Sequence, residues 1–481
     1  MARLGPRVVI AGTHSGVGKT TVATGVMAAL AARGLQVSAA KIGPDFIDPS
    51  YHAVATGRPS CSLDAYLSGE ELLPGLAARA STGTDLLVIE GVMGLFDGSG
   101  QPGCDGSSAA VSRIVDAPVV LVVDASAMSG SVAAVVHGFA TLDRDVRLGA
   151  VVLNKVASAG HEQLLREALA PLRIPILGAI STDDGLAWRE RHLGLVPVAE
   201  QPDTVRASIS RLGQVIARAL DLEALVKLAR SATTRTVADP PTAAEVGKCR
   251  IAVCRGPAFS FVYPENLELF EQAGAEIVGF DPIVEPALPA GCTGLYAGGG
   301  FPELFAAQLA ENRSLLADLR RQVGQGRQVG QGRQVGQGRQ VGQGRQVGQG
   351  MVTWAECGGF VWLSESLDGT AMAGVLEGVH AEMSDRLTIG YRQATTRVPG
   401  YFGPAGTTLR GHEFHRSVAE PTGEGLELHG RFASGRAGYV TSKLFASYLH
   451  QHLAATPRLA EAFVAAACAQ LTAPSLPAAR G

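Results

Sequence analysis

A glycine-rich stretch near the start of the chain carries the residue types that bind phosphate. It reads Gly12-Thr-His-Ser-Gly-Val-Gly-Lys-Thr-Thr21 and lies between an apolar run and a helical pattern. In that context the backbone N–H groups of the turn and of the helix start face phosphate oxygens. Lys19 would bridge the β- and γ-phosphates, and Thr20 would hold Mg²⁺. The predicted ATP-binding residues are Gly16, Gly18, Lys19, Thr20 and Thr21; the alternative is a glycine turn that caps a helix.

Acidic and amide side chains follow two later apolar runs. Glu90 ends Leu86–Glu90 and leads into a loop that reaches Asp97. A carboxylate at the end of a parallel strand beside a P-loop is well placed for Mg²⁺, although a capping Glu is the alternative. Asn154 ends another run and could contact adenine, or simply form a turn.

A second charged group follows a short predicted strand, in Lys41-Ile-Gly-Pro-Asp-Phe-Ile-Asp48. Its charges could hold metal, phosphate or substrate, or could be solvated charges on a turn. We predict Mg²⁺ ligands at Thr20, Asp45 and Glu90. The residues predicted to contact substrate or phosphate are Lys41, Asp45, Asp48 and Asp97.

In the C-terminal half, Cys357 stands where a predicted strand turns into a helix, in Trp354-Ala-Glu-Cys-Gly-Gly-Phe360. A helix N-terminus is expected to lower the pKa of such a thiol. A second glycine turn, Gly298-Gly-Gly-Phe-Pro-Glu303, follows another strand. The N–H groups of the two turns could form an oxyanion hole, for which we select Gly299, Gly300 and Gly358. A buried structural cysteine is the alternative.

The thiol needs a base from elsewhere in the chain. His450, in Ala446-Ser-Tyr-Leu-His450, follows an apolar stretch and is the predicted base. His412 and His415 compete with it, and any of the three could be a structural histidine.

Alternating apolar and helical patterns position these residues. Predicted strands include Val8–Ala11, Leu86–Glu90, Val119–Asp124 and Ala150–Asn154. Such alternation indicates a parallel sheet covered on both faces. After residue 247 a second α/β pattern begins with strands Ile251–Cys254, Glu276–Phe280 and Gly294–Ala297. We therefore predict an α/β protein with an N-terminal P-loop sheet and a second α/β domain.

Composition shifts mark the expected domain boundaries. We assign 1–231 to the nucleotide domain, 232–247 to a Pro-containing linker, 248–471 to the second domain and 472–481 to a tail. Residues 321–350 are five copies of Arg-Gln-Val-Gly-Gln-Gly, which predicts a flexible insertion without a function of its own.

The overall composition excludes several classes of protein. The 481 residues carry a net charge of -3, which gives no basic footprint for nucleic acid. No apolar stretch has the length of a signal or transmembrane segment. The seven cysteines contain no C-x-x-C, so we expect neither a disulfide framework nor zinc, and a reducing cytoplasm.

The ordered set of motifs resembles the cobyrinic (or hydrogenobyrinic) acid a,c-diamide synthase family. The motifs are the P-loop, Lys41–Pro49, Glu90–Gly98, Gly298–Glu303, Glu356–Gly359, Gly411–His415 and Ser447–His450. The P-loop itself is similar to that of dethiobiotin synthetase, and the second domain resembles class I glutamine amidotransferases.

The resemblance implies an ATP- and glutamine-dependent ligase that amidates the a and c acetates of a corrin during cobalamin biosynthesis. Cys357 would be the glutaminase nucleophile and His450 its base. His452 stands where class I enzymes carry a Glu, so a dyad is implied. ATP, Mg²⁺, glutamine and the corrin are the expected ligands, with a homodimer as a candidate assembly. Gly256-Pro257 departs from the family pattern, in which an Asp follows the Arg; if that Asp helps to join the domains, their coupling would be weaker in this chain.

Three alternatives are open. Cobyric acid synthase amidates other side chains of the same ring but differs in the segment at 43–48. A nickel-sirohydrochlorin a,c-diamide synthase would share more of the motifs. A P-loop switch ATPase fused to an inactive glutaminase-like module would be expected to carry a lysine at position 14, where this chain has His14.

Overall fold

The computed structural model describes residues 1–100, 103–182, 190–191, 194–195, 198–324, 350–431 and 433–472. The chain forms two compact units. Unit 1 comprises Met1–Thr242 together with Phe261–Asn266 and His452–Thr456, and unit 2 contains the remaining segments. Two short segments of the C-terminal half thus belong to the N-terminal unit, an arrangement that boundaries along the sequence do not express.

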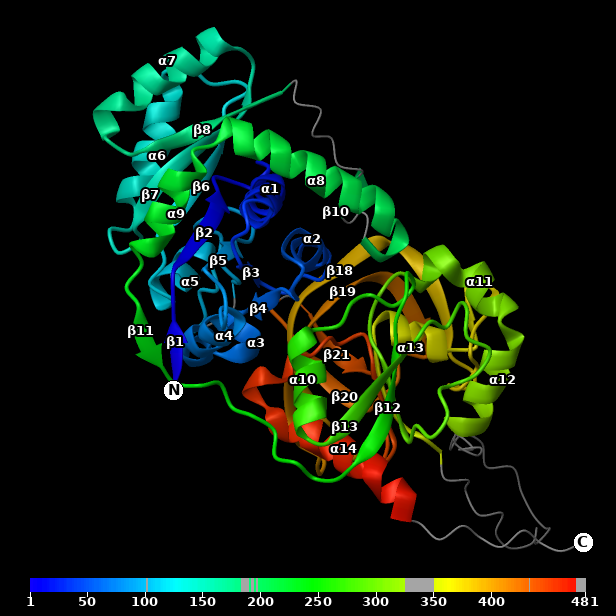
Figure 1. Cartoon of the computed structure of the whole chain (residues 1–481). Helices are drawn as coiled ribbons and strands as arrows, with labels where there is room; N and C mark the ends of the chain where they lie inside the picture. The colour runs from blue at the N-terminus through cyan, green and yellow to red at the C-terminus, as the bar shows by residue number, and fades with distance from the viewer. Residues whose placement is uncertain are drawn as a thin grey trace, which may run out of the picture. The chain divides into compact units, whose positions relative to one another are not determined.

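The core of unit 1 is a seven-stranded sheet in which all neighbouring strands are parallel (Figure 1). Most of its residues are buried apolar side chains, as expected for strands covered on both faces. The predicted strands Leu86–Glu90 and Val119–Asp124 are found with the same bounds. In spatial order the strands are β4 (Cys61–Leu63), β3 (Val37–Ile42), β5 (Leu86–Glu90), β2 (Arg7–Gly12), β6 (Val119–Asp124), β7 (Leu148–Val156) and β8 (Ile176–Ser181).

Small residues let the helices of unit 1 pack closely. Helices α1 and α8 are in extensive contact, and a Cβ at Gly25 of α1 would lie 2.4 Å from Ile216 of α8. That close approach requires glycine. The helices are α1 (Lys19–Ala32), α2 (Ile47–Thr56), α3 (Ala65–Ser68), α4 (Leu73–Ala80), α5 (Ser108–Ile114), α6 (Ser131–Thr141), α7 (Ala159–Leu169), α8 (Pro202–Ala219) and α9 (Leu222–Arg230).

Because the seven strands run in one direction, their carboxyl ends share one edge of the sheet. Gly12, Glu90, Asp124 and Asn154 all lie at or near such ends. Ligands of open α/β sheets bind outside this edge. The fold therefore brings the predicted P-loop and Glu90, which are about 70 positions apart in the sequence, into one place.

Part of the segment predicted as a linker has regular structure. Arg235–Val237 forms β11, which pairs antiparallel with β1 (Ala2–Leu4) inside unit 1. The Thr-Val pair suits a strand, and the proline-rich composition of the flanking residues hid this from the sequence.

The described residues of unit 2 form two sheets. The first has the order β13-β12-β14-β15-β23-β22, parallel except for the edge strand β22. Its strands are β12 (Cys249–Cys254), β13 (Ala275–Phe280), β14 (Gly294–Ala297), β15 (Val352–Glu356), β22 (Tyr439–Val440) and β23 (Leu444–Ser447). The second sheet is built on β18 (His380–Thr396), which pairs antiparallel with β19 (Thr408–Glu420) and β20 (Leu426–His429).

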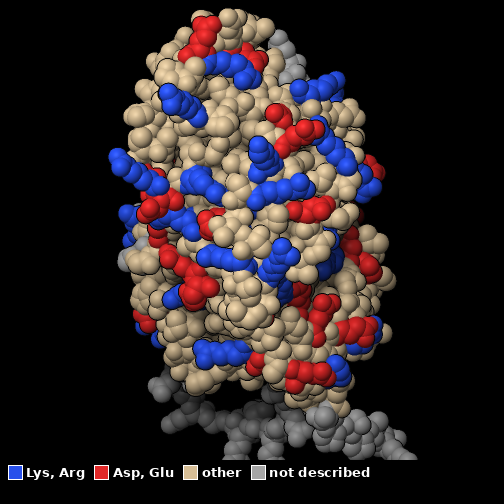
Figure 2. Space-filling model, turned by 60° about the vertical axis from the view of Figure 1, so that its left-hand side comes forward, with Lys and Arg blue, Asp and Glu red and all other residues tan. Residues whose placement is uncertain are grey.

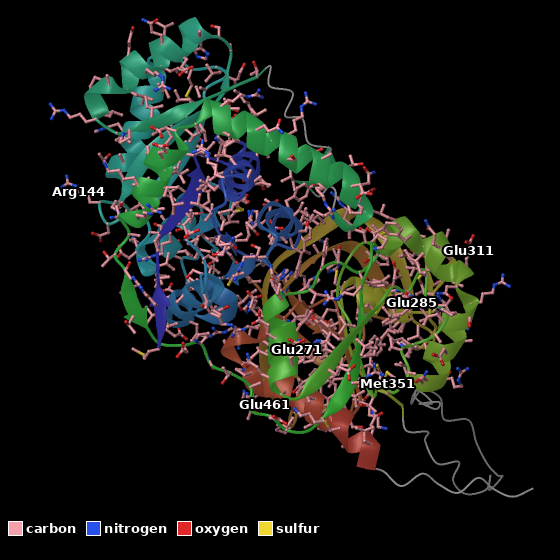
Figure 3. All side chains as sticks on the ribbon, viewed as in Figure 1. Arg144, Glu271, Glu285, Glu311, Met351 and Glu461 are labelled. Atoms are coloured by element: carbon pink, nitrogen blue, oxygen red, sulfur yellow. The ribbon has the colours of Figure 1, made fainter. Side chains whose placement is uncertain are left out.

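The hexapeptide repeat begins at the end of helix α12 (Arg313–Gln322). Its residues 325–349 lie outside the described residues, as does the predicted tail apart from Thr472, the last residue of α14 (Pro457–Thr472). The N–H of Met351 donates to the carbonyl of Gln322 at 2.6 Å, so the chain returns beside the helix it left (Met351 is labelled in Figure 3). The core strand β15 follows at once.

Positively and negatively charged side chains are mixed on the face of the molecule that Figure 2 shows. Figure 2 shows Lys and Arg interspersed with Asp and Glu on the face in view, in keeping with the small net charge. Among the described helices, none combines the length and the apolar character needed to cross a membrane.

Candidate functional site

The P-loop of unit 1 joins the end of β2 to the start of α1. Gly16 and Gly18 have φ of 79° and 97°, values that favour glycine. A Cβ at Gly18 would lie 2.3 Å from the Nδ2 of Asn154, and that Nδ2 donates to the carbonyl of Val17 at 2.8 Å. Asn154, near the end of β7, thus holds the P-loop in place, and its amide nitrogen is used in the hydrogen bond to Val17.

Lys19 curls back over the loop. Its Nζ donates to the carbonyl of His14 at 3.2 Å, and the side chain is largely buried. Burial, together with the nearby Lys41, lowers the pKa of Lys19. A poorly solvated ammonium at a helix start is suited to an anionic ligand.

Glu90 is the centre of a buried polar cluster next to this loop. Thr20 Oγ1 donates to Glu90 Oε1 at 2.6 Å, and Lys41 Nζ lies 3.0 Å from the same oxygen. His52 Nε2 is 2.6 Å from the other carboxylate oxygen. Burial alone would raise the pKa of Glu90, but Lys41 and the hydrogen bonds from His52 and Thr20 hold it below its usual range.

Asp48 completes the cluster. Its Oδ2 lies 2.6 Å from Lys41 Nζ and 3.2 Å from Thr20 Oγ1. Burial and the carboxylates of Asp45 and Glu90 raise the pKa of Asp48. Three carboxyl groups, those of Asp45, Asp48 and Glu90, thus share the ammonium of Lys41.

This oxygen-rich cluster fits a hard divalent cation. The hydroxyl of Thr20 reaches two carboxylates, and Mg²⁺ prefers few protein oxygens completed by water and phosphate. Within the described parts of the chain, no group of three or more His, Cys, Asp or Glu has metal-site geometry. A site made of two carboxylates and one hydroxyl is compatible with that result.

Other predicted residues of this site have local tasks. Asp45 Oδ1 accepts the N–H of Ile47 at 2.8 Å, at the start of α2, and its Oδ2 is 3.8 Å from Lys41 Nζ. Asp97 Oδ2 accepts the N–H of Gly94 at 2.7 Å and so fixes its own loop. Thr21 lies in the first turn of α1. The geometry places Asp48, rather than Asp45, beside Thr20.

Sequence reasoning gave His52 no role. It stands one helical turn after Asp48 in α2 and is completely buried against Glu90. The i, i+4 spacing from an acidic residue of the same motif was the signal that could have found it.

In unit 2, Cys357 occupies a strained elbow between β15 and helix α13 (Gly358–Leu363). Its φ of 47° and ψ of -106° are unusual for a residue with a side chain, and such strain is concentrated at functional sites. The Sγ lies 3.8 Å from the carbonyl oxygen of Phe414 in β19. The predicted strand-to-helix turn is thus present.

The two glycine turns meet at this elbow. A Cβ at Gly358 would lie 2.9 Å from the backbone nitrogen of Gly300, and Gly359 N–H donates to the carbonyl of Gly298 at 2.9 Å. Gly299 lies in the same turn. The residues predicted for an oxyanion hole are therefore neighbours, and a side chain at Gly358 would collide with the opposite turn.

The acidity of Cys357 differs from the sequence expectation. Burial raises the pKa of the thiol, Glu303 raises it further, and the N–H of Gly358 opposes them only in part. The dipole of a six-residue helix does not outweigh desolvation here. A protonated thiol requires a base.

His450 lies near Glu356, the residue that precedes Cys357, with 3.9 Å between its Nδ1 and the Oε2 of Glu356. Its backbone exchanges hydrogen bonds with His412 at 2.9 and 3.0 Å, and the two rings stack with centroids 4.9 Å apart. Burial lowers the pKa of His450 well below its usual value, and His412 and His415 lower it further. A neutral imidazole is the form that accepts a proton.

The competing histidines have partners of their own. His415 Nδ1 lies 2.7 Å from the carbonyl oxygen of Ser417, and its ring stacks on Tyr448 at 3.7 Å. His412 is held against His450.

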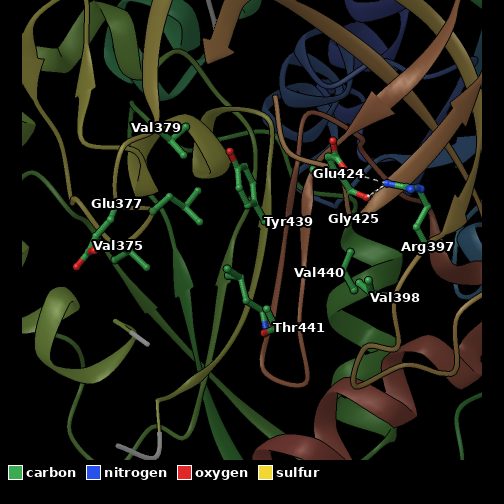
Figure 4. A pocket seen from close by; sticks show the side chains of 13 residues that line it. Val375, Glu377, Val379, Arg397, Val398, Glu424, Gly425, Tyr439, Val440 and Thr441 are labelled. Atoms are coloured by element: carbon green, nitrogen blue, oxygen red, sulfur yellow. Dashed lines mark hydrogen bonds and ion pairs between the residues drawn. The ribbon is translucent and has the colours of Figure 1, made fainter. Parts of the chain in front are cut away.

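A cavity of about 550 Å³ in unit 2 lies beside the ion pair of Arg397 and Glu424, whose atoms are 3.2 Å apart (Figure 4). Its walls are largely apolar, and none of the predicted catalytic residues lines it. The lining includes Val375, Leu376, Val379, Val398, Tyr439, Val440 and Leu444.

Two family models match this chain. Residues 8–196 match the CobQ/CobB/MinD/ParA nucleotide binding domain, and residues 250–330 and 341–457 match the CobB/CobQ-like glutamine amidotransferase domain. A hydrogenobyrinate a,c-diamide synthase of Streptomyces coelicolor is 44% identical, over 95% of this chain and 97% of that protein. The chain belongs to the a,c-diamide synthase family.

Other members of the family agree. A hydrogenobyrinate a,c-diamide synthase of Thermobifida fusca is 42% identical over 97% of both chains. A cobyrinate a,c-diamide synthase of Syntrophotalea carbinolica is 38% identical, over 95% of this chain and 98% of that protein. The predicted family and the predicted α/β class, a P-loop sheet plus a glutamine amidotransferase domain, are confirmed. As an a,c-diamide synthase family member, the chain is a glutamine-dependent amidating ligase.

Proposed function

We propose that this protein amidates the a and c acetate side chains of cobyrinate or hydrogenobyrinate in cobalamin biosynthesis, using ATP and glutamine. The observation that carries the proposal is that each half-reaction has its own built site. Unit 1 holds a P-loop beside a buried acidic cluster, and unit 2 holds a thiol on a glycine-lined elbow. An ATPase switch would have no use for the second site.

In the glutaminase half, His450 takes the proton of the Cys357 thiol, and the sulfur attacks the side-chain amide carbon of glutamine. The N–H groups near Gly299, Gly300 and Gly358 are the proposed donors to the developing oxyanion. The proton on His450 passes to the leaving nitrogen, which departs as ammonia. Water then cleaves the thioester to glutamate and regenerates the thiol.

In the synthetase half, a carboxylate oxygen of the corrin attacks the γ-phosphorus of ATP and gives an acyl phosphate and ADP. Lys19 neutralises the phosphate oxygens from the P-loop side. Ammonia attacks the acyl carbon, phosphate leaves, and an amide remains. Lys41 and Asp97 are the proposed contacts to substrate or phosphate.

We propose Thr20, Asp48 and Glu90 as the residues that hold Mg²⁺, with Asp45 orienting the loop. When bound, this ion neutralises phosphate charge during transfer. The support is the convergence of the Thr20 hydroxyl on both carboxylates. Gly16, Gly18, Thr21 and Asn154 would shape the nucleotide site.

We assign the synthetase reaction to 1–231 and the amidotransferase reaction to 248–471, while 232–242 and 452–456 pack within unit 1. Cytoplasmic ATP and glutamine suit an enzyme that works in the cytoplasm. A homodimer is the proposed assembly, and light scattering of the purified chain tests it.

The deciding experiment offers ATP, glutamine and a panel of tetrapyrrole acids, with product masses as the readout. Conversion of two carboxylates to amides on cobyrinate or hydrogenobyrinate is the expected result. Preferential reaction of nickel sirohydrochlorin, or amidation of other corrin side chains, would replace the substrate assignment. Absence of glutamine-dependent ADP release with every ring would overturn the function.

A further inference from the structure

Glu356 precedes the nucleophile and has no part in the chemistry described so far. It is the last residue of β15 and pairs in parallel register with Ser447, the last residue of β23. His450 follows three residues later. As a result, the Oε2 of Glu356 lies 3.9 Å from the Nδ1 of His450, and both side chains are about 1% exposed.

Three hydrogen-bond donors fix this carboxyl group. Trp354 Nε1–H donates to Oε1 at 2.9 Å, and the N–H of Gln451 donates to the same oxygen at 3.3 Å. The hydroxyl of Tyr296 donates to Oε2 at 3.2 Å. An ionised carboxylate accepts about four hydrogen bonds, so Oε2 has capacity for one more donor. That oxygen is the one nearest to His450.

A histidine that acts as a base needs a fixed oxygen that accepts the N–H of its imidazole ring. One ring nitrogen must be free of hydrogen to take the thiol proton, and the other N–H is best held by a fixed oxygen. Two positions after His450 the chain has His452, which packs within unit 1 with its Nδ1 3.1 Å from Ser68 Oγ. No carboxylate comes from that position in the sequence.

We propose that Glu356 is the positioning residue for His450: its Oε2 accepts the Nδ1–H and leaves Nε2 to take the proton of Cys357. The inference rests on the proposed glutaminase roles of Cys357 and His450. The gap of 3.9 Å exceeds a hydrogen bond, and catalytic hydrogen bonds of this kind shorten when substrate binds. The carboxylate also stabilises the imidazolium that exists between the two proton transfers.

The ionisation of Glu356 should make the glutaminase activity depend on pH. Burial raises its pKa to about 8, although Trp354, Tyr296 and the N–H of Gln451 oppose the rise. The protonated acid would donate to Nδ1 and leave the hydrogen on the wrong nitrogen. Glutaminase activity should therefore increase as the pH rises through about 8. The titratable groups that face this pair include Cys357, Tyr296, Tyr401, His412 and His415.

The test compares Glu356→Gln with wild type in the full-length enzyme, with glutamine and then with ammonium as the nitrogen source. Glu356→Gln should lower glutamine-dependent kcat by roughly 10- to 100-fold, a part of what a positioned base contributes. It should retain ammonium-dependent amidation and lose the rise near pH 8. Asp318→Asn is the control, because Asp318 is another buried, hydrogen-bonded carboxylate of unit 2.

Tyr296→Phe guards against misfolding of the first variant. This change removes one hydrogen-bond donor to Oε2 of Glu356 and so raises the pKa of that carboxyl group. The increase of glutaminase activity with pH should then occur at higher pH, while the maximal rate changes little. The inference is wrong if Glu356→Gln has the wild-type glutamine-dependent rate and the wild-type pH profile. It is also wrong if this variant loses glutamine-dependent and ammonium-dependent amidation equally. If Cys357→Ala retains glutamine-dependent amidation, the proposed function itself is wrong. If Cys357→Ala loses it but Glu356→Gln behaves like wild type, the proposed function stands and Glu356 has no part in it.

Discussion

His52 and Glu90 form a fully buried hydrogen bond, with 2.6 Å between Nε2 and Oε2. The other oxygen of Glu90 is shared by Thr20 and Lys41. A carboxylate with donors on both oxygens is fixed in direction and stays ionised. It therefore presents a fixed negative charge beside the P-loop.

Glu90→Gln should raise the Mg²⁺ concentration needed for ADP release or abolish the release, because the amide carries no charge for the cation. Titration with Mg²⁺ at saturating ATP measures the effect. Glu162→Gln, in α7, is the control, because its half-buried carboxylate is paired with Arg166 and is not part of this cluster. An unchanged metal requirement would return Glu90 to a structural role.

Lys41→Ala should destabilise the ligand-free protein by about 3–5 kcal/mol, since it leaves buried carboxylates without their cation. Denaturant unfolding measures the loss. Added Mg²⁺ with ADP should restore more stability to this variant than to wild type, because the divalent ion relieves the same repulsion. Lys248→Ala removes an exposed lysine paired with Glu245 and should change little. Equal stability of Lys41→Ala and wild type would contradict the buried-cluster interpretation.

Lys19→Ala should abolish amidation with glutamine and with free ammonium alike, because Lys19 serves phosphate transfer and not the nitrogen supply. Product formation from each nitrogen source is the measurement. Near-wild-type synthesis with either one would sink the P-loop assignment.

Cys357→Ala should lose glutamine-driven amidation by more than about 100-fold, yet still make product from high ammonium at raised pH. His450→Ala should give the same split, because it removes the acceptor of the thiol proton. Cys61→Ala, Cys104→Ala and Cys468→Ala are matched controls, since all seven cysteines are free thiols in the structure. If a folded Cys357→Ala variant lost amidation with both glutamine and ammonium, the thiol would instead take part in the synthetase reaction.

Shortening the hexapeptide repeat to one copy should leave amidation with glutamine and amidation with ammonium unchanged. Gln322 and Met351, at the two ends of the run, are hydrogen-bonded neighbours, so a short loop can span the gap. Loop closure costs only about 0.6 kcal/mol per doubling of length, and the shorter chain should be equally or slightly more stable. Thermal unfolding and the two amidation assays check this. Loss of activity would show that the repeat has a role.

The sequence by itself determined features whose physics is local. The order of glycine and lysine in the P-loop and the apolar runs Leu86–Glu90 and Val119–Asp124 depend on neighbours in the chain, and their structures follow. The ordered motifs also identified the family, because each must keep its spacing to act.

The tertiary structure decided which side chains meet. The sequence placed Asp45, and not Asp48, among the predicted Mg²⁺ ligands, whereas the direction of α2 turns Asp48 toward Thr20. The carboxylate nearest His450 comes from Glu356, 94 positions earlier, because the parallel register of β15 and β23 sets their ends side by side. The acidity of Cys357 was likewise beyond the sequence, since burial, which depends on the whole domain, outweighs the local helix dipole.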